Sequence, residues 1–197
     1  AAIQLPPLTV VFLPWRAVGL FYWLTFAVVV VLEAARLLLL AIGFVLGGPA
    51  LLMFAAIKFG GFALLLPLYA TVCHRMIPFF AQCVLPGYRM RRPAWTLVVL
   101  WVLALAHLAL ELMHAYAWLW IPDLALSLLG AGLLYAWWPW RQPMPALLRV
   151  LFLGFAWMPL AFALYAAQSL HFAVTGEYAM GRAPTHALFI GFFASML

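Results

Sequence analysis

The sequence has few charged residues for its length. Only 7% of its 197 residues are Asp, Glu, Lys or Arg, whereas 70% are hydrophobic. A soluble fold of this length could not cover so much apolar surface with so few charges. The apolar runs are long and show no ten-residue alternation, which favours helices over a barrel. The sequence therefore predicts an all-α fold, a polytopic transmembrane helix bundle embedded in the lipid bilayer.

Acidic residues and catalytic motifs are scarcer still. The chain has four carboxylates, so Glu111 and His114, which have the ExxH spacing of di-iron bundles, lack the further acids that such a site needs. No GxxxxGK[ST] or GxGxxG phosphate-binding motif occurs. The two cysteines, Cys73 and Cys83, form no CxxC motif and are predicted to be free thiols. These absences argue against nucleotide-binding, di-iron and disulfide-framework proteins.

The hydrophobic stretches predict about six membrane spans in one domain, residues 1–197. We expect spans at about 17–46, 51–72, 93–118, 123–138 and 145–172, and a sixth from Pro184. The stretch from Ala183 to Leu197 rises only about 22 Å, less than the roughly 30 Å of a hydrocarbon core. We therefore expect a truncated last span and a chain that is a fragment of a longer protein. Gly47, Gly48 and Pro49 are expected to break the first helix.

A few charged residues lie inside the predicted spans. Glu33 and Arg36 are three positions apart, which favours an internal ion pair on one helix face. Lys58 is expected to extend its side chain to the membrane interface. Asp123 follows a proline at a helix start and is interpreted as a helix cap rather than a catalytic acid.

The stretch from Pro93 to Trp118 carries three polar residues on an otherwise apolar helix. At about 100° per residue, His107, Glu111 and His114 fall on one stripe roughly 60° wide. Lipid cannot solvate such side chains, so the stripe is expected to face the protein. It is interpreted either as a cofactor or proton-handling site or as a hydrogen-bond cluster that joins helices.

The basic residues gather in one loop. Arg89, Arg91 and Arg92 account for three of the ten basic residues, which predicts that this loop is cytoplasmic. The net charge of +6 therefore indicates membrane orientation and not nucleic-acid binding. We expect a multi-pass membrane protein, and in a bacterial host the polar loop at 175–182 would face the periplasm.

Alternating spans place three histidines at one membrane depth. His114, His171 and His186 are expected at the outward ends of three spans, with His107 and Glu111 a little deeper. Imidazoles from separate helices of a bundle can hold haem iron, copper or zinc, which predicts a metal site. The alternative is that these histidines lie among lipid headgroups.

A second polar pair precedes a proline. His74 and Arg75 are followed by Pro78 and two phenylalanines. From the residues alone, the pair is either a helix end anchored in lipid headgroups or part of a functional site.

Several segments resemble the signature segments of the NnrS family. These are residues 71–80 (TVCHRMIPFF), 86–89 (PGYR) with 92–93 (RP), 154–160 (GFAWMPL) and 181–191 (GRAPTHALFIG). They follow the family's order over about residues 66–197. The resemblance implies a polytopic bacterial membrane protein that contains haem and copper, serves in the response to nitric oxide and nitrosative stress, and is associated with denitrification.

The resemblance carries over to particular residues. It implies cofactor-binding roles for His74, Arg75 and His186. Arg75 or Arg182 would neutralise haem propionates, and the ligand would be a small diatomic molecule such as nitric oxide. Whether the chain turns over a substrate is left open.

Two other functions stay open beside this one. The first is a non-catalytic membrane subunit or assembly factor, in which the histidines are structural and aromatic faces pack on other membrane subunits. The second is a small-molecule permease, although no paired, broken helices from two repeats are visible.

Overall fold

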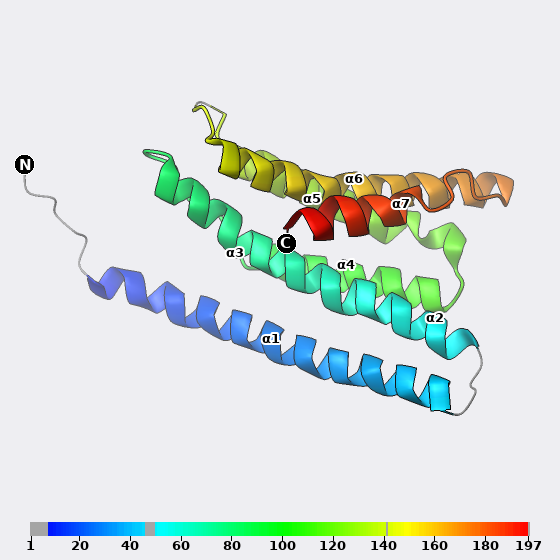
Figure 1. Cartoon of the computed structure of the whole chain (residues 1–197). Coiled ribbons are helices and arrows are strands. Elements are labelled where there is room, and N and C mark those ends of the chain that lie inside the picture. Colours follow the sequence, from blue (N-terminus) through cyan, green and yellow to red (C-terminus); the bar gives the residue numbers. More distant parts are fainter. Residues whose placement is uncertain (1–7, 46–49, 141, 197) are drawn as a thin grey trace, which may run out of the picture.

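The computed structural model describes residues 8–45, 50–140 and 142–196, and these form helices joined by short turns (Figure 1). The long helices are α1 (Leu8–Val45), α4 (Trp95–Leu112), α5 (Trp120–Trp137) and α6 (Ala146–Thr175). Between α1 and α4 one continuous helix consists of α2 (Ala50–Phe59), a π-helical segment (Gly60–Leu65) and α3 (Leu66–Val84). A short final stretch consists of α7 (Ala183–His186), a second π-helical segment (Ala187–Phe193) and a 3-10 turn (Ala194–Met196).

Five of these helices are long and apolar enough to cross a membrane. The spans are Ala27–Val45, Leu52–Val84, Trp95–Leu112, Tyr116–Trp137 and Ala146–Thr175, followed by the shorter apolar stretch Ala183–Met196. The predicted all-α transmembrane bundle is thereby confirmed. Two predictions lie outside the described residues: the helix break at residues 47–49 and the chain end at Leu197.

The second span is longer than predicted. The sequence predicted its end near residue 72, but α3 continues through Pro78 to Val84. Cys73, Ile77 and Ala81 are spaced four apart and all are buried, so one apolar stripe holds the helix against the bundle beyond the expected end. Consequently His74 lies within a helix and does not mark a helix end.

The third span ends earlier than predicted. Helix α4 stops at Leu112, and His114 adopts a left-handed backbone with φ of 56°. The N–H of Ala115 bonds to the Leu110 carbonyl (2.9 Å) and that of His114 to the Glu111 carbonyl (3.1 Å), which is a Schellman motif. The prediction that His114 shares the helical stripe of His107 and Glu111 is therefore wrong, because the chain turns there to begin α5.

The core lies between α5, α6 and the helices that flank them, whereas α1 lies at the edge (Figure 1). In the span windows, 44% of the α6 residues but only 11% of the α1 residues are buried. Glu33 and Arg36 of α1 form the predicted ion pair, with Arg36 Nε 2.7 Å from a Glu33 oxygen. Arg36 also lies close over Gly60, where an added Cβ would meet its Cδ at 2.8 Å. This glycine therefore allows α1 to approach the second helix.

Successive long helices run in opposite directions, so the loops gather at two ends of the bundle (Figure 1). The end formed by the described residues of 85–94 and 138–145 is called the arginine end, because Arg89, Arg91 and Arg92 lie there. The end formed by residues 113–119 and 176–182 is called the histidine end. His114, His171 and His186 all belong to elements that begin or finish at the histidine end, as the alternation of spans predicted.

Candidate functional site: a buried ion-pair chain and a polar pocket

Four ionisable side chains from three helices are joined inside the membrane-spanning segments. Lys58 Nζ of α2 lies 2.5 Å from Glu111 Oε1 of α4. The other carboxylate oxygen of Glu111 lies 3.6 Å from His107 Nε2, and His107 Nδ1 lies 2.5 Å from Asp123 Oδ1 of α5. We call Lys58, Glu111, His107 and Asp123 the ion-pair chain. Basic and acidic side chains alternate along it, which is how buried ionisable groups are tolerated.

The ion-pair chain is more sealed at one end than at the other. The side chains of His107 and Asp123 are 0% exposed, whereas that of Lys58 is 24% exposed. His107 is enclosed by aromatic rings, with the Phe62 ring centroid 4.0 Å away and those of Tyr165 and Phe162 at 5.4 and 6.1 Å. Phe62 comes from the π-helical segment, a local geometry often found at functional sites. Access from outside therefore leads to the Lys58–Glu111 pair and not to Asp123.

Lys58 does not extend to the membrane interface as the sequence predicted. Its ammonium group instead reaches Glu111 and lies 5.5 and 5.9 Å from the ring centroids of Phe54 and Phe62. A carboxylate within hydrogen-bond reach offers a cation a strong partner, so the Lys58 side chain does not need to reach the headgroups. The prediction is wrong because Glu111 lies 53 positions away in the sequence, so nothing near Lys58 reveals that the two side chains pair.

Asp123 is likewise not a helix cap. Helix α5 begins at Trp120 without a side-chain capping bond, and the backbone N–H of Asp123 already bonds to the Leu119 carbonyl. The carboxylate turns inward to accept a hydrogen bond from His107. An acid on the first turn still interacts favourably with the helix dipole, but its partner is the imidazole.

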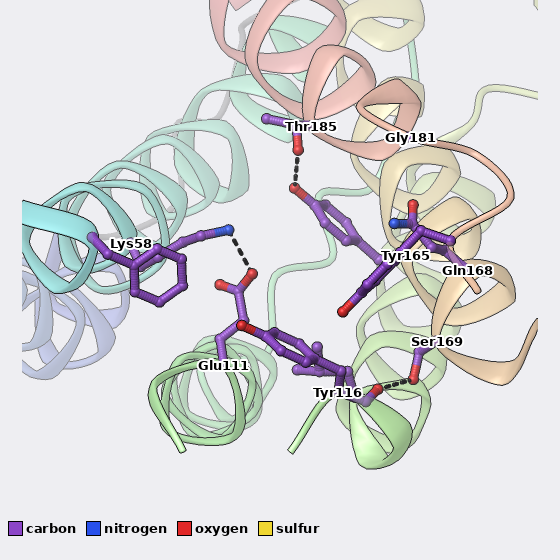
Figure 2. Close-up of a pocket in the computed structure, with 11 residues that line it drawn as sticks. Lys58, Glu111, Tyr116, Tyr165, Gln168, Ser169, Gly181 and Thr185 are labelled. Atoms are coloured by element: carbon purple, nitrogen blue, oxygen red, sulfur yellow. Dashed lines mark hydrogen bonds and ion pairs between the residues drawn. The ribbon is translucent and has the colours of Figure 1, made fainter. Parts of the chain in front are cut away.

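A polar pocket opens onto the Lys58–Glu111 pair at the histidine end. It has a volume of about 230 Å³, and Figure 2 shows Lys58 and Glu111 on one side with Tyr165 and Thr185 opposite. The Tyr165 and Thr185 hydroxyls share a 3.0 Å hydrogen bond. The other lining residues are Phe54, Tyr116, Leu119, Gln168, Ser169, Tyr178 and Gly181.

The pocket wall combines fixed and unsatisfied polar groups. Ser169 donates to the Tyr116 carbonyl (2.7 Å) and accepts from the Trp120 backbone N–H (2.9 Å), which fixes the turn before α5. The Oε1 atom of Gln168 is buried without a hydrogen-bond partner among the described residues. Partial burial raises the pKa of Tyr178 in the loop, so its hydroxyl stays a donor. The pocket can therefore both donate and accept hydrogen bonds to a small guest.

The other predicted metal ligands lie outside this pocket. His114, His171 and His186 are exposed, and none of them lines the pocket. His114 packs against the rings of Phe54 and Tyr116, while His186 Nδ1 bonds to the Arg182 carbonyl (2.9 Å). In the described part of the chain, no three His, Cys, Asp or Glu side chains are grouped so that they could hold a metal ion. The metal assignment of these residues stays a prediction.

His74 lies far along the bundle from His186. It is buried in α3 beside the start of α4, with its Nε2 atom 3.2 Å from Thr96 Oγ1 and its ring centroid 5.7 Å from that of Trp137. Its Nδ1 atom is buried without a hydrogen-bond partner in the described region. Arg75, next to it in α3, is exposed. The structure therefore does not bring His74 and Arg75 together with His186 and Arg182.

Sequence reasoning found two members of the ion-pair chain and missed the functional position of the other two. His107 and Glu111 were selected because they share one face of a helix. Lys58 is the single charged residue of α2 and Asp123 that of α5, and their isolation among apolar residues was the available signal. Two isolated, opposite charges in different spans can be expected to share a buried partner network.

Comparison with known proteins extends the resemblance to the whole chain. The profile of the family described as NnrS protein matches residues 1–197, which includes the stretch before residue 66 where the signature segments are absent. No curated protein and no solved structure matches the chain.

Proposed function

Because the chain belongs to the NnrS family, we propose that it is a multi-pass membrane protein of the nitric-oxide response whose functional centre is the ion-pair chain with the polar pocket. The observation that carries the choice of centre is the placement of four ionisable side chains within membrane-spanning helices, with the outer pair lining a cavity. Ionisable residues inside spans commonly mark substrate, ion or proton pathways. We place the protein in a bacterial inner membrane with the Arg89–Arg92 loop in the cytoplasm.

A purely structural ion-pair network accounts less well for this arrangement. Charges that only join helices are best sealed from water, as His107 and Asp123 are. Lys58 and Glu111 instead border a pocket that opens at the histidine end. A molecule that enters the pocket therefore meets a cation, a carboxylate and several hydroxyl groups.

The proposed guest is a small molecule, with nitric oxide as the first candidate. A cavity of about 230 Å³ is several times the roughly 30 Å³ that one water occupies in the liquid, so a diatomic molecule and some water fit together. Nitric oxide is small and weakly polar and can arrive through lipid. Lys58 and the Tyr165 hydroxyl would orient it, and the aromatic wall around His107 limits how deep it travels.

Haem and copper, which family membership implies, stay a prediction for this chain. The fit of its described residues is poor. The exposed histidines of the histidine end do not line the polar pocket, and the buried His107 is already held between two carboxylates. His74 keeps one buried, unpartnered nitrogen, but a single imidazole offers one axial position only. We therefore route no step of the proposal through either group.

The proposal is tested with variants of the outer pair. Lys58→Met and Glu111→Gln are expressed in a nitric-oxide-sensitive host, and survival is measured at matched membrane protein levels. We expect both to lose protection, because they alter the two charged side chains that border the pocket among the described residues. Glu33→Gln, which alters an ion pair on α1 outside the pocket, is the control and should protect like the wild type. Full protection by Glu111→Gln at normal protein level would contradict the proposal.

An absorption spectrum and a metal analysis of the purified protein test the cofactor prediction separately. A Soret band with iron and copper in stoichiometric amounts would support haem and copper. If the band is present, His74→Ala and His186→Ala show whether either imidazole is a ligand, because loss of a ligand shifts the band. A colourless, metal-free protein would contradict the prediction without touching the pocket proposal.

One observation favours the alternative of a membrane subunit in a larger assembly. Only 11% of the α1 window is buried, and Val31 and Leu38, seven positions apart, are 67% and 61% exposed. A helix face that packs so little against its own bundle is available to another membrane protein. Co-purification of a stoichiometric partner that is lost in the paired Val31→Trp and Leu38→Trp variant would favour this function.

A further inference from the structure

A groove lies between α4 and α5 at the arginine end. It has a volume of about 310 Å³ and is almost entirely apolar. Trp95 and Leu128, which are 61% and 65% exposed, form its outer walls, and the fully buried Trp137 closes its base. The groove belongs to membrane-spanning segments on both sides, so it faces the hydrocarbon region.

The depth of the groove depends on a glycine. A Cβ added at Gly132 would meet no atom within 4 Å, so this stretch of α5 leaves open space. Two positions earlier, Gly130 is packed so tightly that a Cβ would meet the Met158 side chain at 2.7 Å. The two glycines thus have opposite roles: one allows close packing of helices, and the other leaves a channel that the protein does not fill.

The mouth of the groove is cationic. Arg91 lines it and Arg89 lies exposed in the same loop, which contains no acidic residue between positions 85 and 94. The loop is held in place from below, since Trp137 Nε1 donates to the Arg91 carbonyl (2.7 Å) and the Tyr88 hydroxyl donates to the Trp137 carbonyl (2.8 Å). The backbone that carries Arg91 is therefore held in place beside an apolar channel.

We propose that this groove binds one anionic phospholipid, with an acyl chain along Gly132 and the phosphate at Arg91 and Arg89. An apolar channel beside a loop with exposed arginines matches an acyl chain beside an anionic headgroup. Trp95 lies where an indole commonly marks the membrane interface. The site is separate from the ion-pair chain and does not rest on the proposed function.

The test measures retained lipid in the full chain. The protein is reconstituted in nanodiscs of phosphatidylcholine with added phosphatidylglycerol, and bound phosphatidylglycerol is counted by native mass spectrometry after release. We expect one tightly retained phosphatidylglycerol in the wild type. The paired variant Arg89→Gln and Arg91→Gln should weaken its binding about tenfold to thirtyfold, since each basic residue near an anionic lipid surface strengthens binding roughly fivefold.

Two further variants separate the groove from general surface charge. Gly132→Leu fills the channel without changing charge and fits open space, so it should fold normally and lose the retained lipid. Arg149→Gln removes an exposed charge near the arginine end that does not line the groove, and should retain the lipid. Retention by Gly132→Leu at wild-type affinity would overturn the proposal, as would equal retention of phosphatidylcholine by the wild type.

Discussion

The histidine end and the arginine end of the bundle use polar residues in different ways. On the side toward the histidine end, opposite charges are paired from side chain to side chain, as Lys58 with Glu111 and His107 with Asp123. At the arginine end, neutral side chains bond to backbone carbonyls: Trp137 to that of Arg91 and Tyr88 to that of Trp137. The side chains of Arg89 and Arg91 are exposed.

The difference reflects where each set of charges lies. The space between packed membrane-spanning helices holds little water, so a charge there needs an opposite charge within hydrogen-bond reach. A loop at a membrane surface can leave like charges exposed to headgroups and needs only its backbone groups satisfied. The comparison predicts that substitutions toward the histidine end lower the stability of the fold strongly when they remove a charge. Substitutions at the arginine end should lower it less, by an amount that depends on packing.

The largest effect is expected from breaking the sealed half of the ion-pair chain. Asp123→Leu leaves the His107 imidazole buried without its main partner, because Asp123 is 2.5 Å from it and both are fully buried. The loss of stability is expected to be about 3–5 kcal/mol, the usual result of removing one member of a buried pair. Thermal unfolding in detergent measures it.

A matched double variant separates pairing from packing. Combining His107→Leu with Asp123→Leu removes both charges, and it should restore most of the lost stability since apolar residues of similar size replace the pair. If the double variant loses as much stability as the two single variants together, the two residues act independently and the comparison fails.

An intermediate effect is expected at the arginine end. Trp137→Phe removes the indole N–H that satisfies the Arg91 carbonyl and leaves some space in a fully buried position. We expect a loss of about 1–3 kcal/mol, typical of an unsatisfied buried polar group, measured by the same unfolding assay. Trp140→Phe is the control, because Trp140 is exposed although its indole N–H also donates to a carbonyl. If Trp137→Phe and Trp140→Phe lose the same amount of stability, the burial of Trp137 is not the cause of its effect.

The smallest effect is expected at the turn after α4. His114 has a left-handed backbone that costs most residues about 1 kcal/mol relative to glycine, so His114→Gly should raise stability by up to that amount. Gly176, which follows α6 with φ of 76°, is the matched control: Gly176→Ala should lower stability similarly. A marked loss in His114→Gly would indicate that contacts of the imidazole with Phe54 and Tyr116 outweigh the backbone term.

The sequence predicted features that depend on neighbours along the chain. The apolar runs predicted the transmembrane bundle, and the three-residue spacing of Glu33 and Arg36 predicted their ion pair. The stripe of His107 and Glu111 was found for the same reason, since both lie on one helix.

Other features depend on partners that lie far apart in the sequence. Lys58 was expected at the interface because nothing near it in the chain reveals Glu111, and Asp123 was taken for a cap because its position after a proline fits one. The end of α4 was missed for a different reason. Its left-handed residue is a histidine, so the glycine that usually marks a helix end is absent.

The π-helical segment at Gly60–Leu65 determines how the side chains of α3 are rotated about the helix axis relative to those of α2. Each residue of an α-helix advances the chain by about 100° and 1.5 Å, so a wider turn offsets every side chain beyond it. Lys58, before the segment, faces Glu111, while His74, after it, faces Thr96. Both partners belong to α4, so one continuous helix meets the same neighbour at two levels, and the length of this short segment governs whether both contacts can form at once.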